Sequence, residues 1–254
     1  MIWDTVMFHD EIDVLLCRLT ELEPIKDLRH VIIEADVTHQ DRPKPSCLKD
    51  NWSLFERWHD RIVPVWATDL PTAKDNPDPW AREHAQREWA RAGLVDAAPT
   101  DVVLHGDVDE IPTVVAARNV RPGGNYVAMA QVGLFWSLRW RYPEPWYGTV
   151  AAQVNRIGSF GALRDTRNNA IVKIPDAGWH LSWLPKNGMT SARSAHEKVK
   201  TFCHPEVADQ INEGTREDHF VKSGIHVDGL VMDRVDGPWP KWVRDGNAPE
   251  SWFL

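Results

Sequence analysis

The chain has 254 residues, of which 43% are hydrophobic and 26% are charged, and this balance is typical of a soluble globular protein. Its 29 basic and 37 acidic residues give a formal charge of -8, which argues against a protein that binds a nucleic-acid backbone. The length suits one large domain, and we expect a single domain over residues 1–254 with an irregular tail over 237–254.

The cysteines and the hydropathy pattern bear on the compartment. Cys17, Cys47 and Cys203 show neither paired nor metal-binding spacing, and an odd number without a secretory signal fits a reducing environment. We find no apolar run long enough to span a membrane and no signal peptide. The sequence therefore predicts a soluble, cytoplasmic protein.

Four short apolar runs in the first half predict buried strands, at residues 5–8, 30–35, 62–66 and 102–104. Pro64 lies within the third run, and because proline cannot donate to a sheet ladder it favours an edge position for that strand.

The first predicted helix follows residues 5–8. Asp10 is placed to cap its N-terminus, and Asp13 follows three residues later as a variant of the capping box. Apolar side chains then recur at helical spacing, which predicts a core-facing helix: Ile12, Leu15, Leu16, Leu19 and Leu22.

A second helix is predicted after Asn76, with Asp78 as its N-cap and Pro79 in the first helical position. We expect Gly93 to end it. Its buried stripe would consist of Ala81, Ala85, Trp89 and Ala92, and its exposed face would carry Arg82, Glu83, Arg87 and Arg91. Arg87 is compatible with two roles, an ion pair with Glu83 one turn away or a contact in a nucleotide pocket.

The second half is less regular. Residues 127–136 and 150–161 favour strands, and residues 195–202 and 205–211 favour helices. Since the first half alternates apolar strands with helices, the sequence predicts an α/β fold with a mainly parallel central sheet flanked by helices.

The segment Asp107-Val108-Asp109-Glu110-Ile111-Pro112 follows the fourth predicted strand directly. On a continued extended backbone Asp107 and Asp109 would point to the same side, at the strand end where ligands bind in open α/β sheets. Paired carboxylates suit Mg²⁺ or Mn²⁺, ions that also hold substrate phosphates. The alternative is that these acids only form a turn or cap a helix.

Tryptophan is abundant, with 14 residues against 3 tyrosines. Flat indole rings can stack on sugar faces, but core packing explains many of them equally well.

Several segments resemble glycosyltransferase family 17, which includes the β-1,4-mannosyl-glycoprotein N-acetylglucosaminyltransferase. They occur in the family's order between about Thr5 and Gly229 and comprise residues 8–16, residues 31–34 with Lys44-Pro45, residues 107–112, residues 177–183 and Lys198. The resemblance implies a single GT-A type (Rossmann-like) domain and an inverting transfer from a nucleotide sugar, with a divalent cation. Because the membrane anchor of eukaryotic members is not seen, we expect a bacterial or phage member.

The resemblance also implies roles for particular residues. Asp109 is the first candidate for the metal ligand, with Asp107 for the ribose or a water-mediated metal contact and His180 as a more distant ligand. Trp179 is a candidate for stacking on a ring, or else a strand residue of the core. Lys198, Arg193 and Arg87 are candidates for binding the nucleotide. An inverting transfer needs a base near the acceptor hydroxyl, and the candidates are Glu110, Glu217, Asp218 and Asp228.

We therefore expect a Mn²⁺- or Mg²⁺-dependent glycosyltransferase that moves a hexosyl or N-acetylhexosaminyl group, with GlcNAc a candidate, from a UDP-sugar to a carbohydrate or other hydroxyl acceptor. The alternatives are a metal-dependent nucleotidyltransferase or phosphohydrolase, which also uses paired carboxylates, and a carbohydrate-binding module built on the tryptophans.

Overall fold

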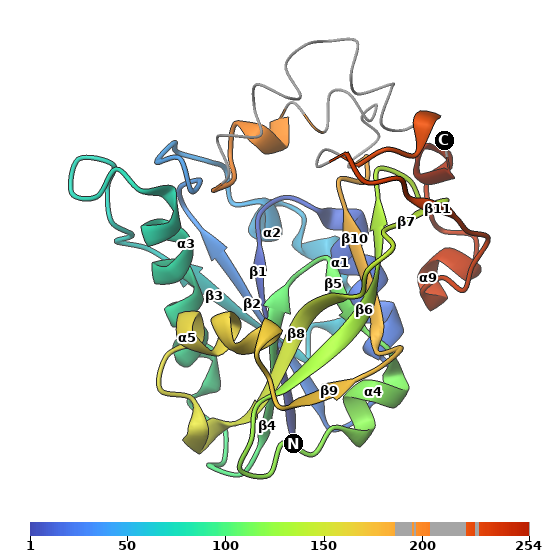
Figure 1. Ribbon diagram of the computed structural model, residues 1–254. Helices are drawn as coiled ribbons and strands as arrows, with labels where there is room; N and C mark the ends of the chain where they lie inside the picture. The colour runs from blue at the N-terminus through green and yellow to red at the C-terminus, as the bar shows by residue number, and fades with distance from the viewer. Residues whose placement is uncertain (186–194, 196, 204–221, 227–228, 254) are drawn as a thin grey trace.

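The computed structural model describes residues 1–185, 195, 197–203, 222–226 and 229–253 (Figure 1). Within these residues, eleven strands form one curled sheet. The strands are β1 Ile2–Phe8, β2 Leu28–Ala35, β3 Ile62–Ala67, β4 Val102–Asp107, β5 Glu110–Pro112, β6 Val127–Phe135, β7 Trp140–Arg141, β8 Trp146–Gln153, β9 Val172–Ile174, β10 Gly178–Ser182 and β11 Asp233–Arg234.

Helices cover both faces of this sheet (Figure 1). The α-helices are α1 Ile12–Leu22, α2 Cys47–Asp50, α3 Pro79–Glu88, α4 Val114–Asn119, α5 Phe160–Asp165 and α9 Lys241–Arg244. The 3-10 helices are η1 Trp52–Trp58, η2 Trp89–Leu94, η3 Val154–Arg156, η4 Thr166–Asn168 and η6 Glu250–Phe253.

The sheet is mixed, so the prediction of a mainly parallel sheet is wrong for its second half. The order β3-β2-β1-β4 is parallel throughout, as the alternation of strands and helices predicts. Beyond β4, the strands β8 and β6 pair antiparallel, and β10 runs parallel to β6 but antiparallel to β5. No long helix connects β6 to β8, and a short connection allows only antiparallel pairing.

The four predicted strands of the first half are present, and Pro64 lies in β3 at the end of the strand order, as expected. The strand predicted at 150–161 ends at Gln153, and η3 and α5 follow it. The predicted irregular tail instead contains α9 and η6. Trp252 of η6 is fully buried in the same core as α1, which gives this tail a fixed place.

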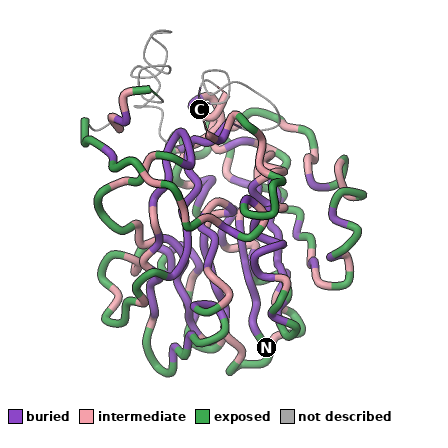
Figure 2. Tube along the Cα trace, turned by 90° about the vertical axis from the view of Figure 1, so that its right-hand side faces the viewer, coloured by how far each residue is buried: buried purple, intermediate pink, exposed green. Residues whose placement is uncertain are grey.

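Apolar cores lie on both sides of the central strands, which Figure 2 shows as buried. On one side α1 packs Leu15 and Leu19 against Val6 and Phe8 of β1. On the other side η2 and α5 cover Val31 and Val103. The predicted face of α1 is confirmed, although its N-cap is Glu11 and not Asp10.

Helix α3 differs most from its prediction. Asp78 caps it as expected, since its Oδ1 accepts a hydrogen bond from the Trp80 N–H at 3.0 Å. The buried face, however, is the charged one and consists of Arg82, Glu83, Gln86 and Arg87. The predicted stripe is half-buried at Ala81, Ala85 and Trp89 and exposed at Ala92. An apolar stripe predicts the buried face of a helix only when that face packs on an apolar core. The buried face of α3 instead contacts polar groups at the edge of a cavity.

Among the described residues, none of the helices combines the length and the apolar character needed to cross a bilayer.

Gly93 lies in η2 and is therefore a packing residue, not the end of the preceding helix. A Cβ atom added there would lie 2.2 Å from Cγ1 of Val31. We predict that Gly93→Ala lowers the free energy of unfolding by about 1–3 kcal/mol, because the core around β2 is overpacked. Urea denaturation measures this loss.

Gly158→Ala is the matched control, since a Cβ there meets nothing within 4 Å, and its stability should stay close to wild type. The double variant Gly93→Ala, Val31→Ala should recover part of the overpacking loss. Equal stability of Gly93→Ala and wild type would contradict this account of η2.

Candidate functional site

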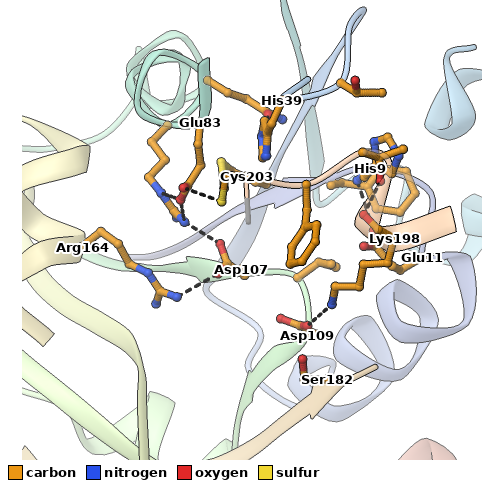
Figure 3. A pocket seen from close by; sticks show the side chains of 18 of the residues that line it. His9, Glu11, His39, Glu83, Asp107, Asp109, Arg164, Ser182, Lys198 and Cys203 are labelled. Atoms are coloured by element: carbon orange, nitrogen blue, oxygen red, sulfur yellow. Dashed lines mark hydrogen bonds and ion pairs between the residues drawn. The ribbon is translucent and has the colours of Figure 1, made fainter. Parts of the chain in front are cut away.

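A cavity of about 490 Å³ lies at the carboxyl ends of β1, β2 and β4. Its walls come from α3, α5, β10 and residues 198–203, so segments far apart in the sequence meet there (Figure 3). This is the edge at which α/β sheets bind ligands, and the volume is that of a typical small-molecule site.

The two acids of the Asp-x-Asp segment contact different partners. Asp107 ends β4, whereas Val108 and Asp109 form a turn before β5. The predicted extended backbone over 107–109 is therefore wrong, and the two carboxylates have different neighbours although both line the cavity. Figure 3 shows Asp107 directed toward Arg164 and Asp109 toward Lys198.

Both oxygens of Asp107 accept hydrogen bonds from buried arginines. Arg87 Nη2 donates to Oδ1 and Arg164 Nη2 donates to Oδ2, each at 2.8 Å. Burial alone would raise the pKa of Asp107, but the two arginines outweigh it and hold that pKa well below its usual range. Asp107 is thus a permanently ionised carboxylate whose charge is neutralised within the protein.

Arg87 makes the ion pair with Glu83 that was one of its two predicted roles, and its predicted contact with a nucleotide stays a prediction. Its Nε donates to Glu83 Oε1 at 2.8 Å, one helical turn away, and its Nη2 reaches Asp107. The side chain also lines the cavity. Its guanidinium is therefore held by two carboxylates, those of Glu83 and Asp107.

Glu110 is a structural residue, so its prediction as the base is contradicted. Its carboxylate is fully buried and accepts hydrogen bonds from Arg164 Nη1 and Nη2 at 2.7 and 2.6 Å. It also accepts from Trp146 Nε1 at 2.7 Å and from the Asp107 N–H at 2.9 Å. Burial acts to raise the pKa of Glu110, but the charge and hydrogen bonds of Arg164 oppose it, and the net result is a pKa below the ordinary value. The carboxylate therefore braces the turn and has no access to a substrate.

Asp109 is the acid that stays available to a ligand. Its Oδ2 lies 3.6 Å from His180 Nε2 and 3.8 Å from Lys198 Nζ, both beyond ordinary hydrogen-bond length. Within the described residues, no hydrogen bond reaches its carboxylate. The structure thus brings together three of the predicted residues, Asp109, His180 and Lys198, at one end of the cavity.

These residues fit a divalent ion in a limited way. Asp109 and His180 supply an oxygen and a nitrogen side by side, which Mn²⁺ accepts. Within the part of the chain that the structure describes, no group of three or more His, Cys, Asp or Glu side chains is arranged to hold a metal. The protein would therefore supply two ligands, and phosphate and water oxygens would complete the set.

The predicted contact of Trp179 with a ligand is contradicted. Residues alternate along β10, so His180 faces the cavity and Trp179 faces the opposite side. Its indole is buried in the core with α1, and its Nε1 donates to the Pro238 carbonyl at 2.8 Å. It is a core residue.

Sequence reasoning missed an aromatic wall of the cavity. Trp146 stacks on His180 with ring centroids 4.3 Å apart, and Phe135 lies edge-on to His180 at 5.3 Å. It also missed Arg164, which lies in a short helix capped by Ser159. Trp146 lies between the two predicted strands of this region, and a local cap at Ser159 does not indicate a ligand.

The remaining predictions, Arg193, Glu217, Asp218 and Asp228, lie outside the described residues.

Residues 1–223 match the sequence model of glycosyltransferase family 17, and since the match covers most of the chain, the chain belongs to this family. The family assigned from the sequence motifs is thus confirmed, and so is the expected class of enzyme, a glycosyltransferase. A search of curated protein sequences finds no match.

Among solved structures, the chain is similar to S. aureus TarS, with 11% identity and a TM-score of 0.40 over 87% of this chain and 44% of that one. It is also similar to the apo-form glycosyltransferase GlyE of Streptococcus pneumoniae TIGR4, with 12% identity and a TM-score of 0.34 over 94% and 55%. The chain spans about half the length of these proteins, and similarity at this level assigns no role to any residue.

Arg164 is expected to be essential to the stability of the acidic turn. Arg164→Met leaves the buried Glu110 without its hydrogen-bonded cation, since Arg167 Nη1 lies 4.0 Å away, and we predict that the free energy of unfolding falls by about 3–5 kcal/mol at pH 7. In wild type the pKa of Glu110 is lower in the folded than in the unfolded state, so its ionised form stabilises the fold. This stabilisation is fully present above about pH 4.3 and is lost as the pH falls from there through the lowered pKa. In the variant the pKa of Glu110 rises above its unfolded value, so its penalty fades on acidification. The difference in the free energy of unfolding between wild type and Arg164→Met should therefore become smaller as the pH falls from about 6 to about 4.

Urea denaturation across this pH range measures the gap. Arg141→Met is the control, because its exposed ion pair with Asp233 should contribute less than about 1 kcal/mol. The double variant Arg164→Met, Glu110→Gln should recover part of the loss. A gap that does not change with pH would show that Arg164 does not stabilise the Glu110 carboxylate.

Proposed function

We propose that this chain is a divalent-metal-dependent, inverting glycosyltransferase of GT-A type. Its donor is a UDP-sugar, with UDP-GlcNAc the first candidate, and its acceptor is a hydroxyl group of a glycan or another molecule. The observation that carries this proposal is the Asp109 carboxylate, which lines the cavity beside His180 and Lys198 while Asp107 and Glu110 are neutralised by arginines. Membership of family 17 supports the class of reaction.

Asp109 and His180 would hold the divalent ion. When bound, the ion neutralises the charge that develops on the departing diphosphate. Lys198 lies on the same side of the cavity, with its Nζ also 5.1 Å from the Trp183 ring centroid, and its ammonium is placed to bind a phosphate oxygen. The Asp109 carboxylate thus lies beside the His180 imidazole and the Lys198 ammonium at one end of the cavity.

Asp107 has a different task in this proposal. Its side chain is 32% exposed, so part of it faces the cavity although both oxygens are bonded to arginines. An ionised carboxylate in a fixed orientation can accept a hydrogen bond from a ribose hydroxyl. Arg87 and Arg164 set that orientation and ensure that the carboxylate does not take up a proton.

The aromatic wall supports binding of a sugar ring. Phe135, Tyr142 and Trp146 line the cavity next to His180. Sugar rings have apolar C–H faces that pack on aromatic rings, while their hydroxyl groups stay at the edges. We assign this wall to the transferred sugar or the acceptor.

We propose that the general base is Glu217, Asp218 or Asp228, which lie outside the described residues. Inversion requires a carboxylate within hydrogen-bond reach of the acceptor hydroxyl on the side opposite the diphosphate. Glu110, the other candidate, is excluded by its burial and its full set of hydrogen bonds.

Asp109→Asn should abolish sugar transfer, by at least about 10²-fold in kcat/KM, while leaving the melting temperature near that of wild type, because this carboxylate binds the ligand and does not brace the fold. The assay measures release of the nucleoside diphosphate from UDP-sugars with Mn²⁺ and an acceptor. Asp233→Asn is the matched control, because that carboxylate is exposed on β11, and it should retain wild-type activity. Wild-type turnover by Asp109→Asn would remove the proposal.

The products separate this proposal from its runner-up. A transferase releases the nucleoside diphosphate and forms a glycosylated acceptor, whereas a nucleotidyltransferase or phosphohydrolase releases a monophosphate, pyrophosphate or phosphate.

A further inference from the structure

A histidine outside the acidic turn is held in one tautomer by its neighbours. Gln86 of α3 is buried, and its Nε2 donates to the Ile33 carbonyl at 3.1 Å. A carbonyl oxygen only accepts, so the amide oxygen of Gln86 must face His39 Nε2, 2.9 Å away. That oxygen also only accepts. His39 Nε2 therefore carries the hydrogen, and the lone pair of the neutral ring lies on Nδ1.

The His39 ring is neutral at pH 7. Burial lowers its pKa below the ordinary 6.5, and the opposing influences of the Gln86 hydrogen bond and of Glu83 do not overcome burial. Its Nδ1 is thus a hydrogen-bond acceptor, and no contact in the described part of the chain uses it.

The backbone around His39 is fixed on two sides. Its N–H donates to the Thr201 carbonyl at 3.1 Å, and its carbonyl accepts from Arg82 Nε. The adjacent Gln40 donates through Nε2 to the carbonyls of Val199 and Phe202, at 2.8 and 3.2 Å. The ring therefore cannot move far without breaking these contacts.

The surroundings of His39 suit a flat heterocycle. Ala35, Val37 and Phe202 line the same cavity, so apolar surface accompanies one oriented acceptor. Figure 3 shows His39 across the cavity from Asp109, with Cys203 and Asp107 between them. A ligand whose phosphates lie at Asp109 and whose ribose lies at Asp107 would thus direct its base toward His39.

We propose that His39 selects the base of the donor nucleotide by accepting a hydrogen bond at Nδ1 from a ring N–H of the uracil type. This inference rests on the proposed function and names a specificity residue for it. Uracil carries a hydrogen on N3, whereas cytosine carries a lone pair there. Cytosine would place the lone pair of its N3 opposite the lone pair of His39 Nδ1. A site whose acceptor expects a hydrogen-bond donor discriminates against such an analogue. Gln86 is the positioning residue that sets the tautomer.

Calorimetry with UDP, CDP and GDP in the presence of Mn²⁺ tests this proposal directly. Wild type should bind UDP at least about tenfold more tightly than CDP, since one hydrogen bond and one avoided lone-pair conflict are worth about 1.4 kcal/mol or more. His39→Phe keeps a flat ring without the acceptor, and its preference for UDP over CDP should fall to about one. Gln86→Leu should reduce the preference part of the way, through loss of the fixed tautomer.

The control is His59→Phe, because His59 stacks on Trp52 outside the cavity, and it should keep the wild-type ratio. Melting temperatures confirm that each variant is folded. Equal binding of UDP and CDP by wild type, tighter binding of GDP, or an unchanged ratio in His39→Phe would each overturn the role of His39 while leaving a nucleotide-sugar enzyme in place. If wild type binds none of the three nucleotides, the proposed function itself fails.

Discussion

The site depends on one buried cation, Arg18 of α1, which holds the backbone of the acidic turn. Its Nη1 donates to the carbonyls of Asp107, Val108 and Glu110 at 3.2, 3.4 and 2.7 Å, while Nε and Nη2 bind both oxygens of Asp4 in β1. Burial would raise the pKa of Asp4, but Arg18 holds it far below its usual range. A buried charge is tolerated only when fully hydrogen-bonded, so the turn is tied to the central strand of the sheet.

Apart from Arg18 and Asp4, the charged residues of the site form two groups. Asp107, Glu110 and Glu83 are matched within the protein by Arg87, Arg164 and Arg167. Such a network is costly to break and fixes geometry, because removing one member leaves another buried and unpaired. Among the described residues, Asp109 has the side chains of His180 and Lys198 as neighbours, both beyond hydrogen-bond length. Asp107 is thus part of the rigid network, whereas we propose that Asp109 binds the ligand.

Local rules predicted what depends on neighbours in sequence. The cap at Asp78, the edge position of Pro64 and the acids at the end of β4 follow from residues a few positions apart. The same rules failed where distant contacts decide. Glu110 is next to Asp109 in sequence and was therefore a candidate for the general base. In the structure it is buried, and Arg164, which is 54 residues away, neutralises its charge. Family motifs placed His180 and Lys198 with Asp109, which no spacing rule could have done.

Helix α3 shows why the failures gather at the site. Periodicity rules assume that a buried helix face is apolar, yet α3 buries Arg82, Glu83, Gln86 and Arg87. Each of these has a polar partner outside α3. Arg82 binds a loop carbonyl, Glu83 accepts from the Cys203 thiol, Gln86 binds a strand carbonyl and a histidine, and Arg87 binds an acid of the turn. A helix that buried charged side chains without polar partners would be unstable, so these contacts must form as the protein folds. A polar buried face beside a strand end is therefore itself a sign of a binding site, and it can be recognised only when the partners are known.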